Sequence, residues 1–136
     1  MGGRGSDSGM NRSVGKGARE LGLTSREIDR LTDTAIDFIK KQERIYGSLT
    51  PGREKDFRDQ IKKEYNAGFS GLEEGRVLDI STKNPNAYLI KRGEKAVSVF
   101  KTGNNTRIGK EYELSETQKK TYLRRAILLR LRPRRM

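Results

Sequence analysis

The spacing of apolar residues changes near residue 70, and this change limits the folds that the chain can adopt. From Thr24 to Ala67, apolar residues recur three or four positions apart, which indicates helices that each bury one face. From residue 76 to 114, β-favouring residues predominate and turn residues separate them, which indicates strands. The chain has 136 residues, enough for one domain with a single core. The pattern therefore predicts one α+β domain over about residues 22–132.

Two helices are predicted in the first half of this domain. Thr24 and Glu27 form a capping box, in which a hydroxyl and a carboxylate three residues apart bind the free amides of a helix start, and Gly47 is expected to end that helix. Pro51 suits the first position of a second helix, which closes at residues 66–68, so that the pair forms a helical hairpin. The apolar positions expected in the core of the first helix are Ile28, Leu31, Ala35, Phe38, Ile39 and Ile45.

The second half of the domain predicts an antiparallel sheet of three or four strands followed by a helix. Residues 87–91 and 96–101 flank a turn and form a hairpin, while residues 76–81 and 107–114 predict further strands. Ser115 to Gln118 is a second capping box, so a C-terminal helix is expected to follow. The sequence does not decide where this helix ends, because residues 126–132 fit either a helix or a strand. Pro133 would end either element, and residues 133–136 would follow as a basic tail.

Residues 1–21 predict a flexible, glycine-rich leader, because they lack apolar periodicity. The stretch from Gly9 to Gly17 is not a phosphate-binding loop. Five residues rather than four separate Gly9 from Gly15 and Lys16, and Gly17 stands where the pattern needs Ser or Thr.

Positive charge is concentrated at the C-terminus, and this concentration indicates the kind of partner. The net charge is +12, and residues 119–136 hold eight basic and no acidic side chains. Such a cluster repels itself unless an anion neutralises it, which favours a phosphate backbone over the alternative of a merely solvated tail. The residues predicted to bind nucleic acid are Lys119, Lys120, Arg124, Arg125, Arg130, Arg132, Arg134 and Arg135, with Arg4, Arg12, Lys16 and Arg19 of the leader assisting.

The composition argues against most catalytic and metal-dependent functions. The chain has no His and no Cys, which removes the commonest general base and the usual zinc ligands. Glu73 and Glu74 are two adjacent carboxylates that could in principle act as a catalytic pair. Adjacent side chains in a strand point in opposite directions, so we expect these two residues to lie in a solvated turn before a strand. We therefore predict no catalytic residue, no metal and no cofactor. No apolar run is long enough to cross a membrane, so a cytoplasmic protein without a membrane partner is expected.

One class of enzyme remains compatible with a chain that lacks His. The order of two helices, an antiparallel sheet and a basic terminal segment resembles the small RelE-type and barnase-type ribonuclease toxins. That resemblance implies metal-independent RNA cleavage by Lys, Arg and Tyr side chains. The residues of suitable type are Tyr88, Lys91, Arg92, Tyr112 and Arg124.

A second resemblance lies in the leader. Residues 1–9, MGGRGSDSG, are similar to the openings of small proteins encoded by phages and mobile elements. This resemblance implies an accessory nucleic-acid-binding protein, a toxin, or an anti-CRISPR inhibitor of a host guide-RNA nuclease. We expect a small basic protein that contacts the phosphates of a nucleic acid or a nucleoprotein, and the inhibitor and toxin functions remain as alternatives. The sequence does not distinguish RNA, DNA and an acidic protein as the partner.

Overall fold

The computed structural model describes residues 14–42, 44 and 47–131, and it contains both helices and an antiparallel sheet. The helices are α2 (Lys16–Glu20), α3 (Ser25–Lys40), α5 (Pro51–Ala67), the short 3-10 turn η2 (Phe69–Gly71) and α6 (Glu116–Arg130). The strands are β1 (Val77–Ile80), β2 (Ala87–Arg92), β3 (Lys95–Thr102) and β4 (Asn105–Glu113). The α+β prediction, with two helices, an antiparallel sheet and a C-terminal helix, is confirmed.

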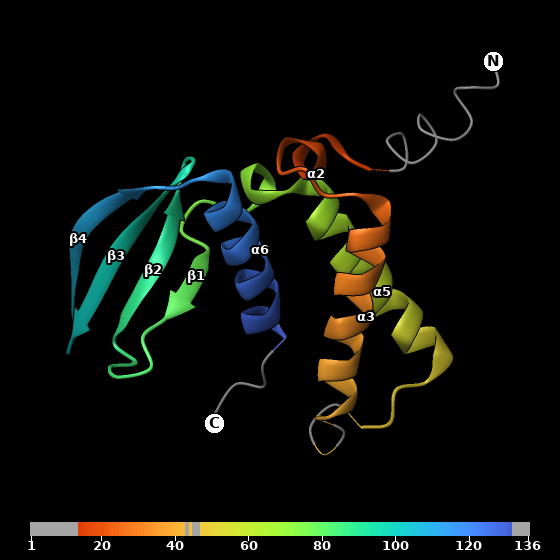
Figure 1. Cartoon of the computed structure of the whole chain (residues 1–136). Coiled ribbons are helices and arrows are strands. Elements are labelled where there is room, and N and C mark those ends of the chain that lie inside the picture. The colour runs from red at the N-terminus through yellow and green to blue at the C-terminus, as the bar shows by residue number, and fades with distance from the viewer. Residues whose placement is uncertain (1–13, 43, 45–46, 132–136) are drawn as a thin grey trace.

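Helix α6 is the centre of the molecule. Figure 1 shows it between the sheet and the antiparallel pair of α3 and α5, with all the helices on one side of the sheet. Leu123, Ala126 and Ile127 of α6 are completely buried in this position. The one core therefore lies around α6 and joins the helical hairpin to the sheet.

Local capping signals position the three long helices as the sequence predicts. Both capping boxes form, at Thr24 and at Ser115, and the Thr50 side chain accepts the amide of Arg53 ahead of Pro51. The first helix, however, ends at Lys40 and not at Gly47.

The early end of α3 has a local cause in Gln42. The Gln42 amide binds the carbonyl of Ile39, three residues back, and its side chain donates to the Phe38 carbonyl at 3.1 Å. These bonds tighten the last turn and satisfy the free carbonyls. The expected core residue Ile45 lies outside the described residues.

At the other end of the chain, residues 126–130 are helical, which resolves the choice between helix and strand up to Arg130.

Residues 14–21 do not belong to a flexible leader, contrary to the sequence-based expectation. They include helix α2, and Val14, Ala18 and Leu21 are buried in the core. The glycines that suggested flexibility allow the backbone of α2 to touch the end of α5. A Cβ atom on Gly17 would lie 1.8 Å from the Ala67 carbonyl oxygen. The remainder of the proposed leader, residues 1–13, lies outside the described residues.

The four strands form a meander in the order β1-β2-β3-β4, with every neighbouring pair antiparallel. A bulge interrupts the last pair, because Ser98 of β3 faces two residues of β4, Gly109 and Lys110. The Ser98 hydroxyl accepts the Lys110 amide at 2.8 Å, and a Cβ on Gly109 would lie 2.6 Å from that hydroxyl oxygen. The bulge therefore needs a small residue at position 109.

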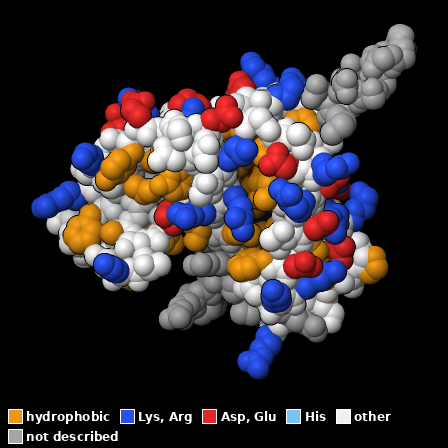
Figure 2. Space-filling view, viewed as in Figure 1, with side chains coloured by type: hydrophobic (Ala, Val, Ile, Leu, Met, Phe, Trp, Pro, Cys, Tyr) orange, Lys and Arg blue, Asp and Glu red, His pale blue; other side chains and the backbone are white. Residues whose placement is uncertain are grey.

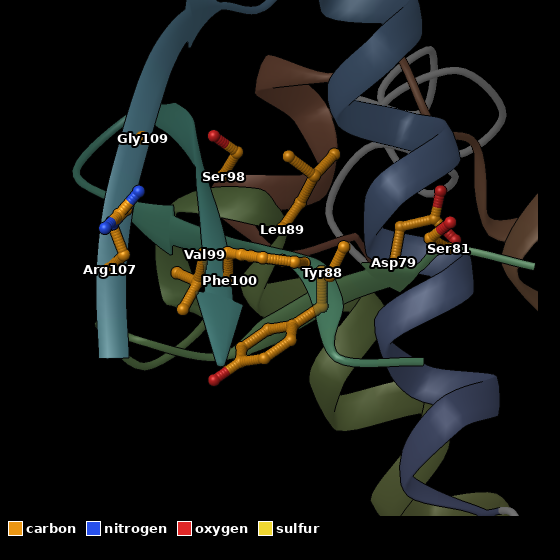
Figure 3. Close-up of a pocket in the computed structure, with 10 residues that line it drawn as sticks. Asp79, Ser81, Tyr88, Leu89, Ser98, Val99, Phe100, Arg107 and Gly109 are labelled. Atoms are coloured by element: carbon orange, nitrogen blue, oxygen red, sulfur yellow. The ribbon is translucent and has the colours of Figure 1, made fainter. Parts of the chain in front are cut away.

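Cross-strand pairing assigns each residue to one face of the sheet, since directly paired side chains point to the same side. The inner face is turned toward α6, and its Leu78 and Ala96 are fully buried in the core. Figure 3 shows the side chain of Tyr88 pointing to the opposite side from those of Leu89 and Ser98. The pairing therefore gives an outer face with seven apolar residues, Val77, Ile80, Tyr88, Ile90, Val97, Val99 and Ile108, and with the polar residues Arg92, Lys95, Lys101, Thr106, Glu111 and Glu113.

Tyr65 of α5 supplies a pH-dependent contribution to stability. Its side chain is 1% exposed, and burial raises the pKa of its phenol from 10.0 to about 12. The unfolded chain therefore loses this proton first as the pH rises, and the free energy of unfolding should fall between about pH 10 and 12.

A shift of this size corresponds to about 2–3 kcal/mol. Chemical denaturation of the wild type and of Tyr65→Phe from pH 8 to 11.5 checks the expectation. The difference in stability between the two proteins should shift with pH in favour of Tyr65→Phe. Parallel curves would show that Tyr65 does not control this loss.

Candidate nucleic-acid interface

The basic cluster predicted in residues 119–136 is partly neutralised within the fold. Lys119 pairs with Glu94 at 3.0 Å, Arg125 pairs with Asp79 at 2.7 Å, and Arg130 pairs with Glu64. The three carboxylates come from the β2–β3 turn, from β1 and from α5. The C-terminal segment has no acidic residue of its own, but the fold brings acidic residues of other elements into contact with it. The self-repulsion expected of this cluster is correspondingly smaller.

The other two described cations of the cluster lie at a different surface. Lys120 and Arg124 line a hollow of about 160 Å³ between α3 and α6, together with Leu23, Glu27, Leu31, Tyr65 and Thr121. Within the described part of the chain, neither has a carboxylate within ion-pair distance. These two side chains therefore keep their charge available to solvent.

The basic residues predicted at the N-terminus divide into two groups. Lys16 and Arg19 are exposed on α2, which packs on α5 and η2 near the start of α6 (Figure 1). They lie away from the end of α6 that carries Arg130. The remaining predicted residues, Arg4, Arg12, Arg132, Arg134 and Arg135, lie outside the described residues.

A groove of about 460 Å³ lies on the inner face of the sheet beside α6 (Figure 3). Ala87, Leu89 and Phe100 give it an apolar floor, and Ser98 and Gly109 leave it open because their side chains are so small. Phe100 is 40% exposed there, which is unusual for an aromatic side chain on a sheet face that is turned toward the core.

Charged side chains of both signs, Arg107 and Asp79, line this groove. Arg107 of β4 is the direct cross-strand partner of Phe100, and Asp79, held by Arg125, lies on the side of α6. A second hollow of about 760 Å³ shares Asp79 with the groove and is lined by Arg125 and Lys83. Figure 2 shows hydrophobic side chains gathered over the sheet, next to basic side chains over α6. Of the cluster residues that the structure describes, Arg125 lines this second hollow.

Tyr112 adds a second exposed aromatic ring to the inner face. It is 42% exposed on β4, opposite Ala96, and the Lys110 ammonium lies 6.0 Å from its ring centroid. The sequence pattern singled out Tyr112 only as a residue suited to a ribonuclease site, and it did not single out Phe100. The available signal was β3 itself, where apolar residues occupy both alternating sets of positions.

The five residues considered for a ribonuclease site do not form one site. Tyr88 and Arg92 belong to the outer face of β2, whereas Tyr112 belongs to the inner face of β4. Lys91 is only 4% exposed, and Arg124 lines the separate hollow between α3 and α6. The geometry therefore brings no general acid and base of this set together.

The pair Glu73 and Glu74 is not simply a solvated turn, as the sequence suggested. Glu74 accepts a hydrogen bond from the buried Lys91 ammonium at 2.7 Å and another from the Gly93 amide. These bonds hold the pKa of the Glu74 carboxyl below its usual value, with the Lys91 contact as the largest cause. The Lys91 ammonium also lies 5.8 Å from the centroid of the Phe69 ring. Glu74 is thus a structural partner of Lys91.

The fold defines a small α+β protein in which a four-stranded meander, one central helix and a helical hairpin surround a single core. Comparisons with protein-family models, with curated proteins and with solved structures found no match to this chain. Among the described residues, no cluster of carboxylates is suited to hold a metal ion, and no helix is both long and apolar enough to span a membrane.

Proposed function

We propose that the protein binds single-stranded nucleic acid along the inner-face groove, with Phe100 as a stacking platform and Arg107 and Arg125 as phosphate contacts. The observation that carries this proposal is an exposed aromatic ring at the floor of an apolar groove, with Arg107 lining the groove on one side and Arg125 bound to Asp79 at the other side. Proteins that bind single strands without sequence preference combine these two elements, an aromatic platform and a cationic path for the backbone.

Two aromatic rings support stacking of more than one base. Phe100 of β3 and Tyr112 of β4 lie on the inner face of adjacent strands. Tyr112 pairs with Ala96, which is four residues before Phe100 in β3. This separation is about 13 Å at 3.3 Å per residue. Small side chains, Ser98 and Gly109, occupy the space between them. A single nucleic-acid strand with its bases turned outward would therefore lie along a flat surface that has one aromatic ring near each end.

Both arginines are accessible to a phosphate. The Arg125 side chain is 50% exposed and that of Asp79 is 37% exposed, so their ion pair contributes little, about 0–1 kcal/mol. Arg107 is exposed on the edge strand β4. The Arg125 guanidinium also lies 5.8 Å from the centroid of the Tyr122 ring. An exposed guanidinium can turn to a phosphate and bind it in a bidentate manner.

The test is fluorescence anisotropy of labelled 12-nucleotide oligo-dT and oligo-U with the full chain, purified through nuclease and high salt. Phe100→Leu keeps an apolar side chain but removes stacking, and it should weaken binding about tenfold, since stacking contributes about 1–3 kcal/mol per base. Phe100→Trp should retain the affinity. Arg107→Gln should reduce the slope of log K against log salt by about 0.7.

Lys63→Gln is the matched control, because Lys63 is an exposed cation of α5 outside the groove. It should leave the salt slope unchanged. Equal effects of Lys63→Gln and Arg107→Gln, or wild-type affinity of Phe100→Leu, would contradict the proposal. No oligonucleotide binding together with capture of a protein that survives nuclease treatment would favour the inhibitor hypothesis instead.

A further inference from the structure

The hollow between α3 and α6 holds two cations that no ion pair among the described residues neutralises. It lies on the side of α6 that faces the helical hairpin, away from the sheet and its groove (Figure 1). Lys120 and Arg124 line it from adjacent turns of α6, four residues apart. Like charges at this spacing on a helix repel each other and destabilise it slightly. An anion bound between the two side chains would remove that repulsion.

A buried hydroxyl group opens into the same hollow. Tyr65 of α5 is 1% exposed and lines the hollow beside Arg124. Burial raises the pKa of its phenol to about 12, and the nearby positive charge of Arg124 opposes this rise. Among the described residues, none forms a hydrogen bond with this hydroxyl. Since every described side-chain polar atom that is sealed from solvent has a partner, the hydroxyl is reached through the hollow and can donate to a ligand there.

The other residues that line the hollow are apolar or already have hydrogen-bond partners. Leu23 and Leu31 form an apolar wall, which strengthens electrostatic attraction by keeping water away. The Thr121 hydroxyl donates to the carbonyl one turn before it at 3.1 Å. Glu27 is the acidic member of the lining, and its carboxylate accepts the amide of the N-cap residue of α3 at 3.4 Å. The described lining therefore carries two positive charges and one negative charge.

We propose that this hollow binds a terminal phosphate group through Arg124, Lys120 and the Tyr65 hydroxyl. At neutral pH such a group has three free oxygens and a charge of about −1.5 to −2. The planar guanidinium of Arg124 binds two oxygens, and Lys120 and Tyr65 donate to the third. A carboxylate has only two oxygens, which the guanidinium alone would occupy. The volume of about 160 Å³ is below the about 300–1,000 Å³ of sites that hold whole small molecules, so it suits a single group.

Two sources present this group, namely inorganic phosphate and the phosphorylated 5′ end of a nucleic-acid strand. An internal phosphodiester carries one charge and two free oxygens, so it matches the three donors less well. The inference does not rest on the groove of the sheet, because the hollow lies on another side of α6 and shares no lining residue with the groove.

The test is an NMR titration of the ¹⁵N-labelled full chain, freed of nucleic acid, with inorganic phosphate at neutral pH and constant ionic strength. We expect saturable shifts of the amides of residues 120–124 and of Tyr65. Arg124→Gln should weaken binding about tenfold, because it removes the charged bidentate contact. Tyr65→Phe keeps the buried ring and removes only the hydroxyl, and it should weaken binding about three- to tenfold.

Two further variants separate a specific site from general attraction of anions. Glu27→Gln preserves the capping box, since glutamine also suits that position, and removes the negative charge from the hollow. It should therefore bind phosphate about two- to threefold more tightly. Lys63→Gln is the matched control, because Lys63 is an exposed cation that does not line the hollow. It should leave phosphate binding unchanged.

A second experiment identifies the source of the phosphate. Anisotropy compares 3′-labelled oligo-dT that carries a 5′-phosphate with the same strand that carries a 5′-hydroxyl. Tighter binding of the phosphorylated strand, lost in Arg124→Gln, would assign the site to strand ends. Equal binding of both strands, or of neither, together with the phosphate-induced shifts, would assign it to free phosphate.

The inference is wrong if inorganic phosphate causes no saturable shifts at residues 120–124. It is also wrong if Arg124→Gln and Lys63→Gln affect phosphate binding equally, if Tyr65→Phe binds like the wild type, or if Glu27→Gln fails to bind more tightly. The phosphate titrations contain no nucleic acid, so failure of the groove proposal would leave their outcome unaffected.

Discussion

Replacing Gly17 by alanine should destabilise the protein by about 3 kcal/mol, although helix propensity alone favours alanine by about 1 kcal/mol. Gly17 lies inside α2, and its missing side chain leaves room for the end of α5. An added Cβ would lie 1.8 Å from the Ala67 carbonyl oxygen and 2.8 Å from the Gly68 nitrogen. Both are backbone atoms, so no change of side-chain rotamer can relieve the overlap. We expect α2 to separate from α5 and expose Val14 and Ala18.

Gly52→Ala is the matched control for this substitution. Gly52 lies in the first turn of α5, and a Cβ atom there would meet nothing within 4 Å. That variant should be as stable as the wild type or up to about 1 kcal/mol more stable. Urea denaturation followed by circular dichroism measures both proteins. A Gly17→Ala variant that matches Gly52→Ala in stability would show that the close packing of α2 on α5 is not required.

Removing the Glu74 carboxylate should lower the melting temperature by about 6 °C. The substitution Glu74→Ala leaves the Lys91 ammonium, which is 4% exposed, without its ion-pair partner. It also removes the acceptor of the Gly93 amide at the tip of the β2–β3 hairpin. A buried charge without a partner destabilises a fold more than the intact pair stabilises it. Thermal unfolding at neutral pH measures the change.

Two further variants separate the charge effect from a general effect of altering this turn. Glu73→Ala changes the neighbouring carboxylate, which is exposed, and should have almost no effect. Lys91→Met keeps the length of the buried side chain without its charge, so adding it to Glu74→Ala should recover most of the lost stability. If the double variant melts at or below the temperature of Glu74→Ala alone, the unpaired ammonium is not the cause.

The candidate interface combines residues that sequence patterns rank very differently. Arg125 was predicted from the basic cluster, whereas Phe100 looked like an ordinary strand residue. They lie at neighbouring hollows that share Asp79, because α6 covers only part of the inner face and leaves the floor of the groove over β2 and β3 open beside it. The part of a sheet that a helix covers depends on how the two pack together. No local pattern of residues in the sequence indicates it. The groove could therefore not be predicted from the chain alone.

The sequence by itself determined where α3, α5 and α6 begin and how the strands follow one another. These features depend on contacts within three or four residues, such as the capping boxes at Thr24 and Ser115 and the turns at Gly93 and Gly103. Such contacts leave a direct record in the spacing of residues.

Only the tertiary structure decided what the glycines of α2 do, which cations are neutralised and which sheet face is bare. Glu94, Asp79 and Glu64 lie 25, 46 and 66 residues from the cations that they bind. Gly15 donates to the Asn66 side chain 51 residues away. Pairings of this kind arise when distant segments pack around one core. Their energies depend on burial and distance, which a linear pattern of residues does not contain.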